Sequence, residues 1–319
     1  MGAYVVRRLV TAIPVLLGIS LVLFTVLALA PGDPFGELAT NPNVPPEVRA
    51  NLRKQFGLDD PVAVRYVRWF SSMVRGDWGF SFVSRVNVDT LIRQRLATTI
   101  FVLGSAQILA LIIAIPVGIL SARRPYSLFD QIATTLAFIG FSLPTFFTGL
   151  LFILFFSIYL DWLPFIYRAD IQASGLQWLW ENLKQGVMPI TVLGLFQGAQ
   201  LTRFVRASVL DVIQLDYIRT ARSKGLAERK TLVKHVVRNA LIPVVTLLGI
   251  QVPQIFTGAV VTEQIFRVPG IGSLLISSIL SNDTPVIMGI TFVFAGLVVI
   301  FGLLADLLYG WLDPRISFR

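Results

Sequence analysis

The sequence has no cysteine and one histidine among its 319 residues. The lack of cysteine excludes disulfides, zinc–thiolate sites and iron–sulfur clusters, and one histidine excludes a histidine metal cluster. Charged residues make up 14% of the chain, whereas a soluble globular domain has about a quarter. Hydrophobic residues reach 55%, and the mean hydropathy is +0.74. This composition indicates a membrane protein.

Several sequence motifs of enzymes are missing as well. The chain has no G-x-x-x-x-G-K-[ST], so it has no P-loop to hold ATP phosphates. It also lacks the H-E-x-x-H motif of zinc proteases and the G-x-S-x-G motif of serine hydrolases. We therefore expect no catalytic residue, no metal and no cofactor on this chain.

Uncharged runs long enough to cross a bilayer, which takes roughly 20 residues, occur six times. They are Leu9–Gly32, Leu96–Ala122, Gln131–Leu160, Gln185–Thr202, Asn239–Thr262 and Thr284–Ala305. The first run is too long for the apolar part of a signal peptide, which predicts a retained membrane anchor. The sequence thus predicts an all-α membrane protein with six transmembrane helices.

Acidic residues are absent from these runs, and Glu263, Asp283 and Asp306 lie just beyond the ends of a run. We expect these carboxylates to be solvated at the membrane rim. Intramembrane ionisable residues are typical of ion-coupled carriers. The sequence therefore argues against a proton- or sodium-driven carrier.

Basic residues predict the orientation of the chain, because cytoplasmic segments carry an excess of Lys and Arg. With both termini cytoplasmic, the inner segments hold Arg7, Arg8, Arg123 and Arg124, together with the central basic stretch. We expect three parts: residues 1–32 with the first span, an extracytoplasmic segment 33–95, and a core 96–319. Within 33–95, helices are predicted over 45–57 and from Asp60, as the N-cap, to Gly76.

Polar amides and prolines interrupt the apolar spans. Proline breaks or kinks a membrane helix, and the freed backbone groups need new partners. Two interpretations remain for the amides: hydrogen bonds between helices, or a pathway lined by neutral groups that donate and accept. The candidate pathway residues are Gln107, Pro144, Gln197, Gln200, Gln251 and Gln254.

The most basic stretch is DYIRTARSKGLAERKTLVKHVVRNALIP, residues 216–243. Asp216 is predicted to cap a short helix over Tyr217–Lys224, and Gly225 to end it in the left-handed conformation. A second helix over Glu228–Leu241 has one apolar stripe, with which we expect it to lie on the bilayer and enter the fifth span.

The spacing Arg219-Thr220-Ala221-x-x-x-Gly225 resembles the EAA loop of bacterial ABC importer permeases. The whole stretch resembles the dipeptide/oligopeptide permease family, as do "FSLPTFFTGLLFILFF", "EQIFRVPGIGSLL" and "YGWLDPRI". The long segment after the first span is similar to the first permease subunit of the pair. The generic pattern has Glu and Ala where this chain has Arg219 and Thr220, so contacts made through that Glu in other importers do not carry over.

This resemblance implies a type I ABC importer permease fold in the bacterial inner membrane, with a partly helical extracytoplasmic insertion after the first span. It implies a coupling loop over 207–238, whose coupling helix docks on an ATPase. That helix comprises Asp216, Tyr217, Ile218, Arg219, Thr220, Ala221, Arg222, Ser223, Lys224, Gly225 and Leu226.

The implied partners are a second homologous permease subunit, two cytoplasmic P-loop ATPases that carry ATP and Mg, and an extracytoplasmic solute-binding protein. No nucleic acid is implied. The implied cargo is di- and oligopeptides. The alternatives are another cargo, namely a nickel chelate, glutathione, a sugar or an opine, or a membrane scaffold whose basic loop binds anionic lipid.

Overall fold

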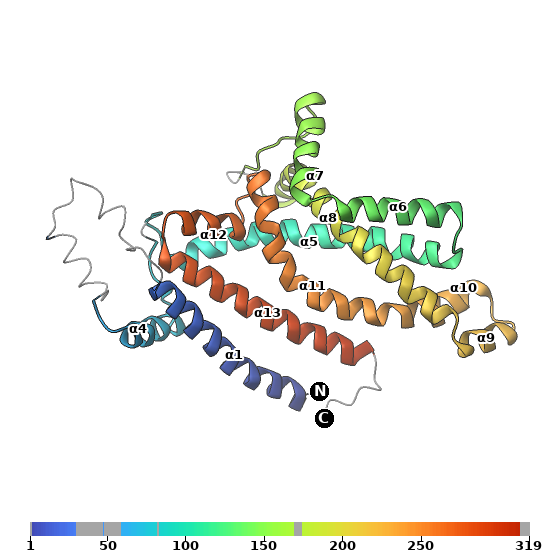
Figure 1. Ribbon diagram of the computed structural model, residues 1–319, viewed down its shortest axis with the longest axis horizontal. Coiled ribbons are helices and arrows are strands. Elements are labelled where there is room, and N and C mark those ends of the chain that lie inside the picture. Colours follow the sequence, from blue (N-terminus) through green and yellow to red (C-terminus); the bar gives the residue numbers. More distant parts are fainter. Residues whose placement is uncertain (1, 30–46, 48–58, 82, 169–173, 313–319) are drawn as a thin grey trace. The chain divides into compact units, whose positions relative to one another are not determined.

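The computed structural model describes residues 2–29, 47, 59–81, 83–168 and 174–312 (Figure 1). In that part of the chain all regular elements are helices, beside an isolated antiparallel bridge between Phe80 and Asn87. The predicted all-α class is therefore confirmed. The helix predicted over 45–57 lies outside the described residues, apart from Glu47.

Four helical segments in the described residues are long and apolar enough to cross a membrane. They are Val6–Leu29, Val88–Arg123, Glu228–Gly249 and Thr284–Leu304. A further apolar segment is bent: α6 (Leu128–Ser142) is followed by α7 (Thr145–Phe152) and the π-helix η1 (Ile153–Tyr159), with a bend of 99°. There are five candidate spans if this bent pair counts as one. The count of six spans is therefore not confirmed.

The break confirms that a proline interrupts the third predicted span, and it corrects the expectation of one span over Gln131–Leu160. Leu143 is extended, with φ −83° and ψ 127°, because the residue before a proline avoids the helical region. Pro144 then precedes α7 as its N-cap residue.

The fourth predicted span, Gln185–Thr202, lies within α8 (Gly175–Ile213). This helix is not among the segments that satisfy the length and hydropathy of a span. Many of its residues are buried by other helices. Its buried residues include Gln185, Gly194, Gly198 and Thr202, and small and polar side chains are typical of the surfaces at which membrane helices pack together.

The chain forms two compact units. The first contains residues 1–97 and 270–300, with α1 (Gly2–Leu29), α4 (Val62–Val74), α12 (Ile271–Leu280), and the first parts of α5 (Val88–Arg123) and α13 (Thr284–Leu312). Its core joins Val88, Leu91, Ile92, Ile271, Leu274, Val286 and Ile290.

Helix α4, in the predicted extracytoplasmic segment, packs on α1. The ring of Phe24 lies 5.5 Å from those of Tyr66 and Trp69, and the hydroxyls of Ser20 and Tyr66 are 2.9 Å apart. The helix begins at Val62 after Pro61, so the predicted cap at Asp60 is wrong by one position. Asp60 instead pairs with Arg68 at 2.9 Å.

The second unit contains residues 98–269 and 301–319, including α8 and α11 (Arg238–Ile265). Helix α8 contacts α6, α7 and α11. Small buried residues recur every four positions on α5 and α8. They are Ala106, Ala110, Ala114 and Gly118 on α5, and Gly194, Gly198 and Thr202 on α8. Such residues allow two membrane helices to bring their backbones close together.

Gly118 lies at a close approach of these two helices. A Cβ atom there would lie 2.8 Å from the Cβ of Val205 and 3.0 Å from the carbonyl oxygen of Thr202. Gly194 has a similar position, where a Cβ atom would lie 2.8 Å from Cδ2 of Leu109. Neither position has room for a side chain without displacing its neighbours.

We expect Gly118→Ala to lower the free energy of unfolding by about 1–3 kcal/mol, because an added methyl group overpacks the contact. Gly104→Ala on the same helix is the control, since a Cβ atom there meets nothing within 4 Å. Thermal unfolding in detergent measures both variants. Equal stability of the two would contradict a tight α5–α8 contact.

Candidate functional site

The short helix predicted over Tyr217–Lys224 is present as α9 (Asp216–Ser223). Leu215 occupies the N-cap position and makes no side-chain cap, so the predicted cap at Asp216 is wrong by one residue. Asp216 lies in the first turn, where a negative charge favours the helix dipole. It forms an exposed pair with Arg219 at 3.6 Å.

Gly225 ends the helix as predicted, with φ +75°. The amide of Leu226 donates to the carbonyl of Ala221 at 3.4 Å, and that of Gly225 donates to the carbonyl of Arg222 at 2.9 Å. These two bonds form a Schellman motif, which uses a left-handed residue at the position of Gly225. A Cβ atom on Gly225 would meet nothing within 4 Å, so the glycine is needed for its backbone conformation and not for space.

Two residues of the predicted site fasten α9 to the protein. Ile218 is fully buried and Ala221 is nearly so. Ile218 belongs to an apolar cluster with Ala122, Val205, Val209, Val236, Ala240 and Val244. This cluster, called here the α9 mount, joins α9 to the end of α5, the last turns of α8, the π-helix over Thr231–Val237 and the start of α11. Leu226 is half-buried, and the other eight residues of the predicted site are exposed.

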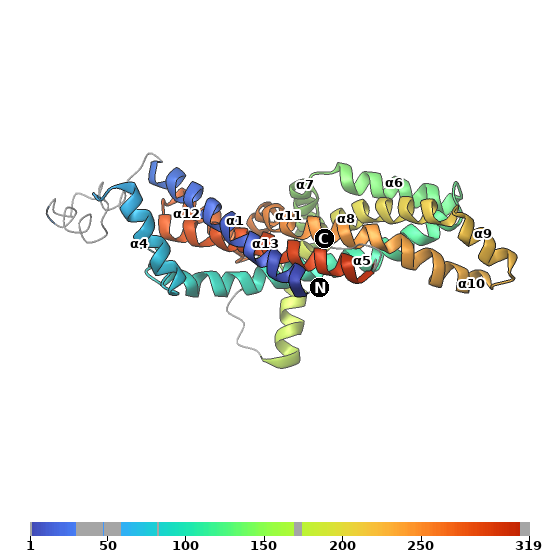
Figure 2. The same ribbon diagram turned by 90° about the horizontal axis from the view of Figure 1, so that it is seen from below.

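The segment after Gly225 differs from the prediction. It contains α10 (Glu228–Lys230), the π-helix η2 (Thr231–Val237) and then α11, and Figure 2 shows α9 and α10 together at one end of the second unit. Part of the expected apolar stripe packs on the protein, since Val236 and Ala240 are buried in the α9 mount. Val233, from the same stripe, is exposed.

Polar contacts further fix the loop. Arg222 binds Glu228 through two bonds, from Nε at 3.1 Å and from Nη2 at 2.8 Å. The Nδ2 of Asn239 donates to the hydroxyl of Tyr217 at 3.1 Å. The side chain of Arg219 remains 72% exposed. Arg219 therefore presents a positive charge to the outside, whereas Arg222 serves to hold α9 against α10.

The structure describes the surroundings of four of the six candidate pathway residues. Gln107, Gln197 and Gln200 are half-buried, and Pro144 stands at the α6–α7 break. Nε2 of Gln107 and Oε1 of Gln197 are buried without a hydrogen-bond partner among the described residues. The side chains of Gln251 and Gln254 are not among those that the structure describes. The pathway lining thus stays a prediction.

Two carboxylates expected at the solvated rim are buried. Glu263 is 3% exposed and accepts a bond from the hydroxyl of Thr99 at 2.7 Å. Asp283 is 2% exposed and accepts a bond from the hydroxyl of Ser81. The expectation of solvated rim charges is wrong for both residues, because segments distant in the sequence cover them. The side chain of Asp306 is not among those that the structure describes.

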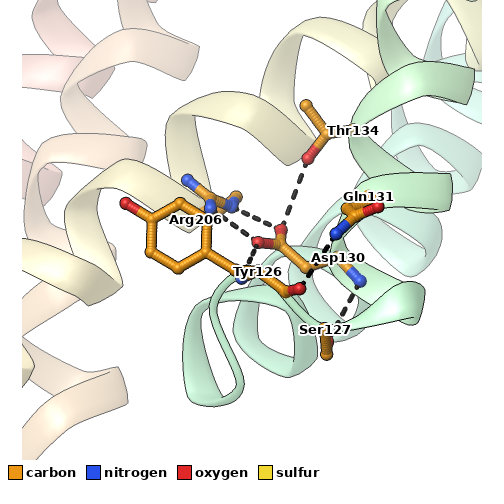
Figure 3. A network of polar contacts seen from close by, with 6 residues as sticks. All are labelled: Tyr126, Ser127, Asp130, Gln131, Thr134 and Arg206. Atoms are coloured by element: carbon orange, nitrogen blue, oxygen red, sulfur yellow. Dashed lines mark hydrogen bonds and ion pairs between the residues drawn. The ribbon is translucent and has the colours of Figure 1, made fainter.

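A further polar network joins α6 to α8 (Figure 3). Arg206 donates to both oxygens of Asp130, from Nε at 2.6 Å and from Nη2 at 2.7 Å. The backbone N–H of Tyr126 and the hydroxyl of Thr134 donate to the same carboxylate at 2.8 and 3.4 Å. Sequence analysis missed this pair. Ser127 and Asp130 have the spacing of a helix start, but that signal does not indicate Arg206.

Comparison with known proteins places the chain in a family. Residues 114–318 match the family described as "Binding-protein-dependent transport system inner membrane component", and residues 1–103 match the N-terminal domain family of such membrane components. The chain belongs to this family. It is therefore a multi-pass inner-membrane component of a transport system, not an enzyme by itself.

Individual relatives match along the full chain. The oligopeptide transport system permease protein AppB of Bacillus subtilis is 42% identical, over 100% of both chains. The dipeptide transport system permease protein DppB of Escherichia coli is 35% identical, over 99% of both. The crystal structure of an amino acid ABC transporter matches 75% of this chain and 100% of its own, with a TM-score of 0.50 at 13% identity. This likeness supports the ABC permease fold expected from the sequence.

We expect Ile218→Ala to loosen α9, because truncating a buried isoleucine costs about 2–5 kcal/mol. Hydrogen exchange of the amides of residues 216–226 measures this local loss. Thr220→Ala on the exposed face is the control and should leave exchange close to that of the wild type. Unchanged exchange in Ile218→Ala would show that the α9 mount does not hold the helix.

Proposed function

We propose that this chain is a transmembrane pathway subunit of an ATP-driven, binding-protein-dependent importer of di- and oligopeptides. The full-length similarity to peptide permeases supports the cargo class. The observation that carries the mechanism is α9, a short basic helix that is exposed on one face and fastened to the helical core through Ile218 on the other.

In this proposal α9 docks in a groove on a cytoplasmic ATPase subunit. Tyr217, Arg219, Thr220 and Lys224 offer exposed contact groups, while Ile218 and Ala221 transmit force to α8 and α11. ATP and Mg bind to the two ATPase subunits and not to this chain. Closure of the ATPases favours one permease conformation, which is a population shift driven by differential binding.

The remaining partners follow from the same proposal. A second homologous permease subunit completes the pathway. The solute-binding protein docks on segments 33–95 and 263–283, and both termini face the cytoplasm. Neutral amides such as Gln107, Gln197 and Gln200 suit peptide bonds, because they donate and accept hydrogen bonds without requiring one particular cargo side chain. Nickel chelates, glutathione, sugars and opines are the alternative cargoes.

Gly225→Val tests the docking helix. A β-branched residue in the left-handed conformation should cost roughly 1–2 kcal/mol and distort the end of α9. We expect an inserted, assembled complex in which transport is lost or ATP hydrolysis no longer responds to substrate. Gly225→Asn is the matched control, since asparagine tolerates this conformation. Normal coupled transport by Gly225→Val would exclude α9 as the docking element.

Native mass spectrometry of the cognate solute-binding protein tests the cargo. We expect a mixture of short peptides to co-purify with it and to leave when the complex transports. A single sugar, metal chelate or opine in their place would refute peptide import while leaving the ABC permease assignment intact.

A further inference from the structure

The Asp130–Arg206 pair joins α6 to α8 in the second unit. Asp130 occupies the first turn of α6, with a side chain that is 4% exposed, and Arg206 lies near the end of α8, with a side chain that is 25% exposed. A buried carboxylate is costly unless it is paired and fully hydrogen-bonded. Both carboxylate oxygens of Asp130 accept hydrogen bonds (Figure 3). These bonds stabilise the negative charge of the carboxylate inside the protein.

The same turns of α8 also hold α9. Val205 and Val209, which flank Arg206 in the sequence, belong to the α9 mount together with Ile218. Helix α8 therefore carries the docking helix and, through Arg206, the first turn of α6. A displacement of α9 that moves this end of α8 must move the partner of Asp130 as well.

Helix α6 runs antiparallel to α8 from this pair to the proline break. Further along, Cζ of Arg203 lies 4.2 Å from the ring centre of Phe138, and the rings of Phe141 and Phe196 are 6.0 Å apart. These ring contacts tolerate sliding, whereas two parallel bonds from a guanidinium to a carboxylate fix both distance and direction.

Apart from the ion pair and these ring contacts, much of the surface of α6 is exposed. Asp130 and Ala137 are its buried residues, while Leu128, Ile132 and Leu136 are at least half-exposed. The helix ends at Ser142, just before the 99° bend into α7. The ion pair thus connects the α9 mount to a helix that leads directly to the Pro144 break.

We infer that Asp130 and Arg206 are positioning residues that transmit the movement of α9 through α6 to the α6–α7 break, and so couple ATP hydrolysis to the opening of the pathway. This inference rests on the proposed function, in which α9 docks on the ATPase. Asp130 and Arg206 touch neither ATP nor cargo.

The test uses the complete complex, reconstituted in lipid with its ATPase subunits and binding protein. The measured quantity is the ratio of ATPase activity with loaded binding protein to basal activity. For Asp130→Asn and for Arg206→Gln we expect this ratio to fall at least about fivefold, the lower range of coupling between distant sites. The double variant should lose no more than either single variant, because the two residues act as a unit.

Thr134→Val is the matched control. It removes the 3.4 Å donor from the same carboxylate and leaves the ion pair in place, so its ratio should stay near that of the wild type. Arg206→Lys keeps the charge without the planar fork, and we expect it to assemble with a reduced ratio. If the neutral variants fail to assemble, the ATPase ratio of the Arg206→Lys complex alone tests the inference.

A wild-type ratio in an assembled Arg206→Lys complex, or in an assembled Asp130→Asn complex, would overturn the inference, as would losses that multiply in the double variant. An effect of Thr134→Val as large as that of Asp130→Asn would also overturn it. A wild-type complex that shows no stimulation at all would instead refute the proposed function, so the two failures are distinguishable.

Discussion

Apolar side chains gain little by leaving lipid, so two helices in a bilayer adhere where their backbones approach closely or where polar groups pair. In the second unit, α5 and α8 approach closely because small residues recur at four-residue intervals on both helices. They are alanine and glycine on α5, and glycine and threonine on α8. Gly118 and Gly194 allow no Cβ atom without displacement of a neighbour. Because α8 also contacts α6, α7 and α11 and leads into α9, the placement of α9 depends on this close approach.

Polar side chains then provide the directional contacts that close packing lacks. Arg206 fixes α6 to α8, and Arg222 fixes α9 to α10, each through two bonds to one carboxylate. The two pairs differ in burial, since the Asp130 side chain is 4% exposed and that of Glu228 is 47% exposed. An exposed pair contributes little to stability, so Arg222 chiefly orients the loop. The buried pair cannot lose one partner without leaving an uncompensated charge.

Two local signals in the sequence predicted the local structure correctly, namely the helix end at Gly225 and the break at Pro144. Gly225 ends α9 because few other residues adopt its backbone angles, and Pro144 breaks the third span because the residue before it avoids the helical region. Burial was less predictable, because it depends on contacts distant in the sequence. In the sequence, Glu263 and Asp283 look like charges at the membrane rim. In the folded chain, both are buried and accept hydrogen bonds from Thr99 and Ser81. The partner of Asp130 is 76 positions away, and no short motif connects the two.

The α9 mount has a consequence for biosynthesis. Its members lie between Ala122 and Val244, so the ribosome has made every part of the mount before it reaches α12 and α13. Since chains emerge and fold from the N-terminus, α9 can take its final form while α12 and α13 are still being translated. The surface on which an ATPase subunit is proposed to assemble is thus complete before the permease itself is.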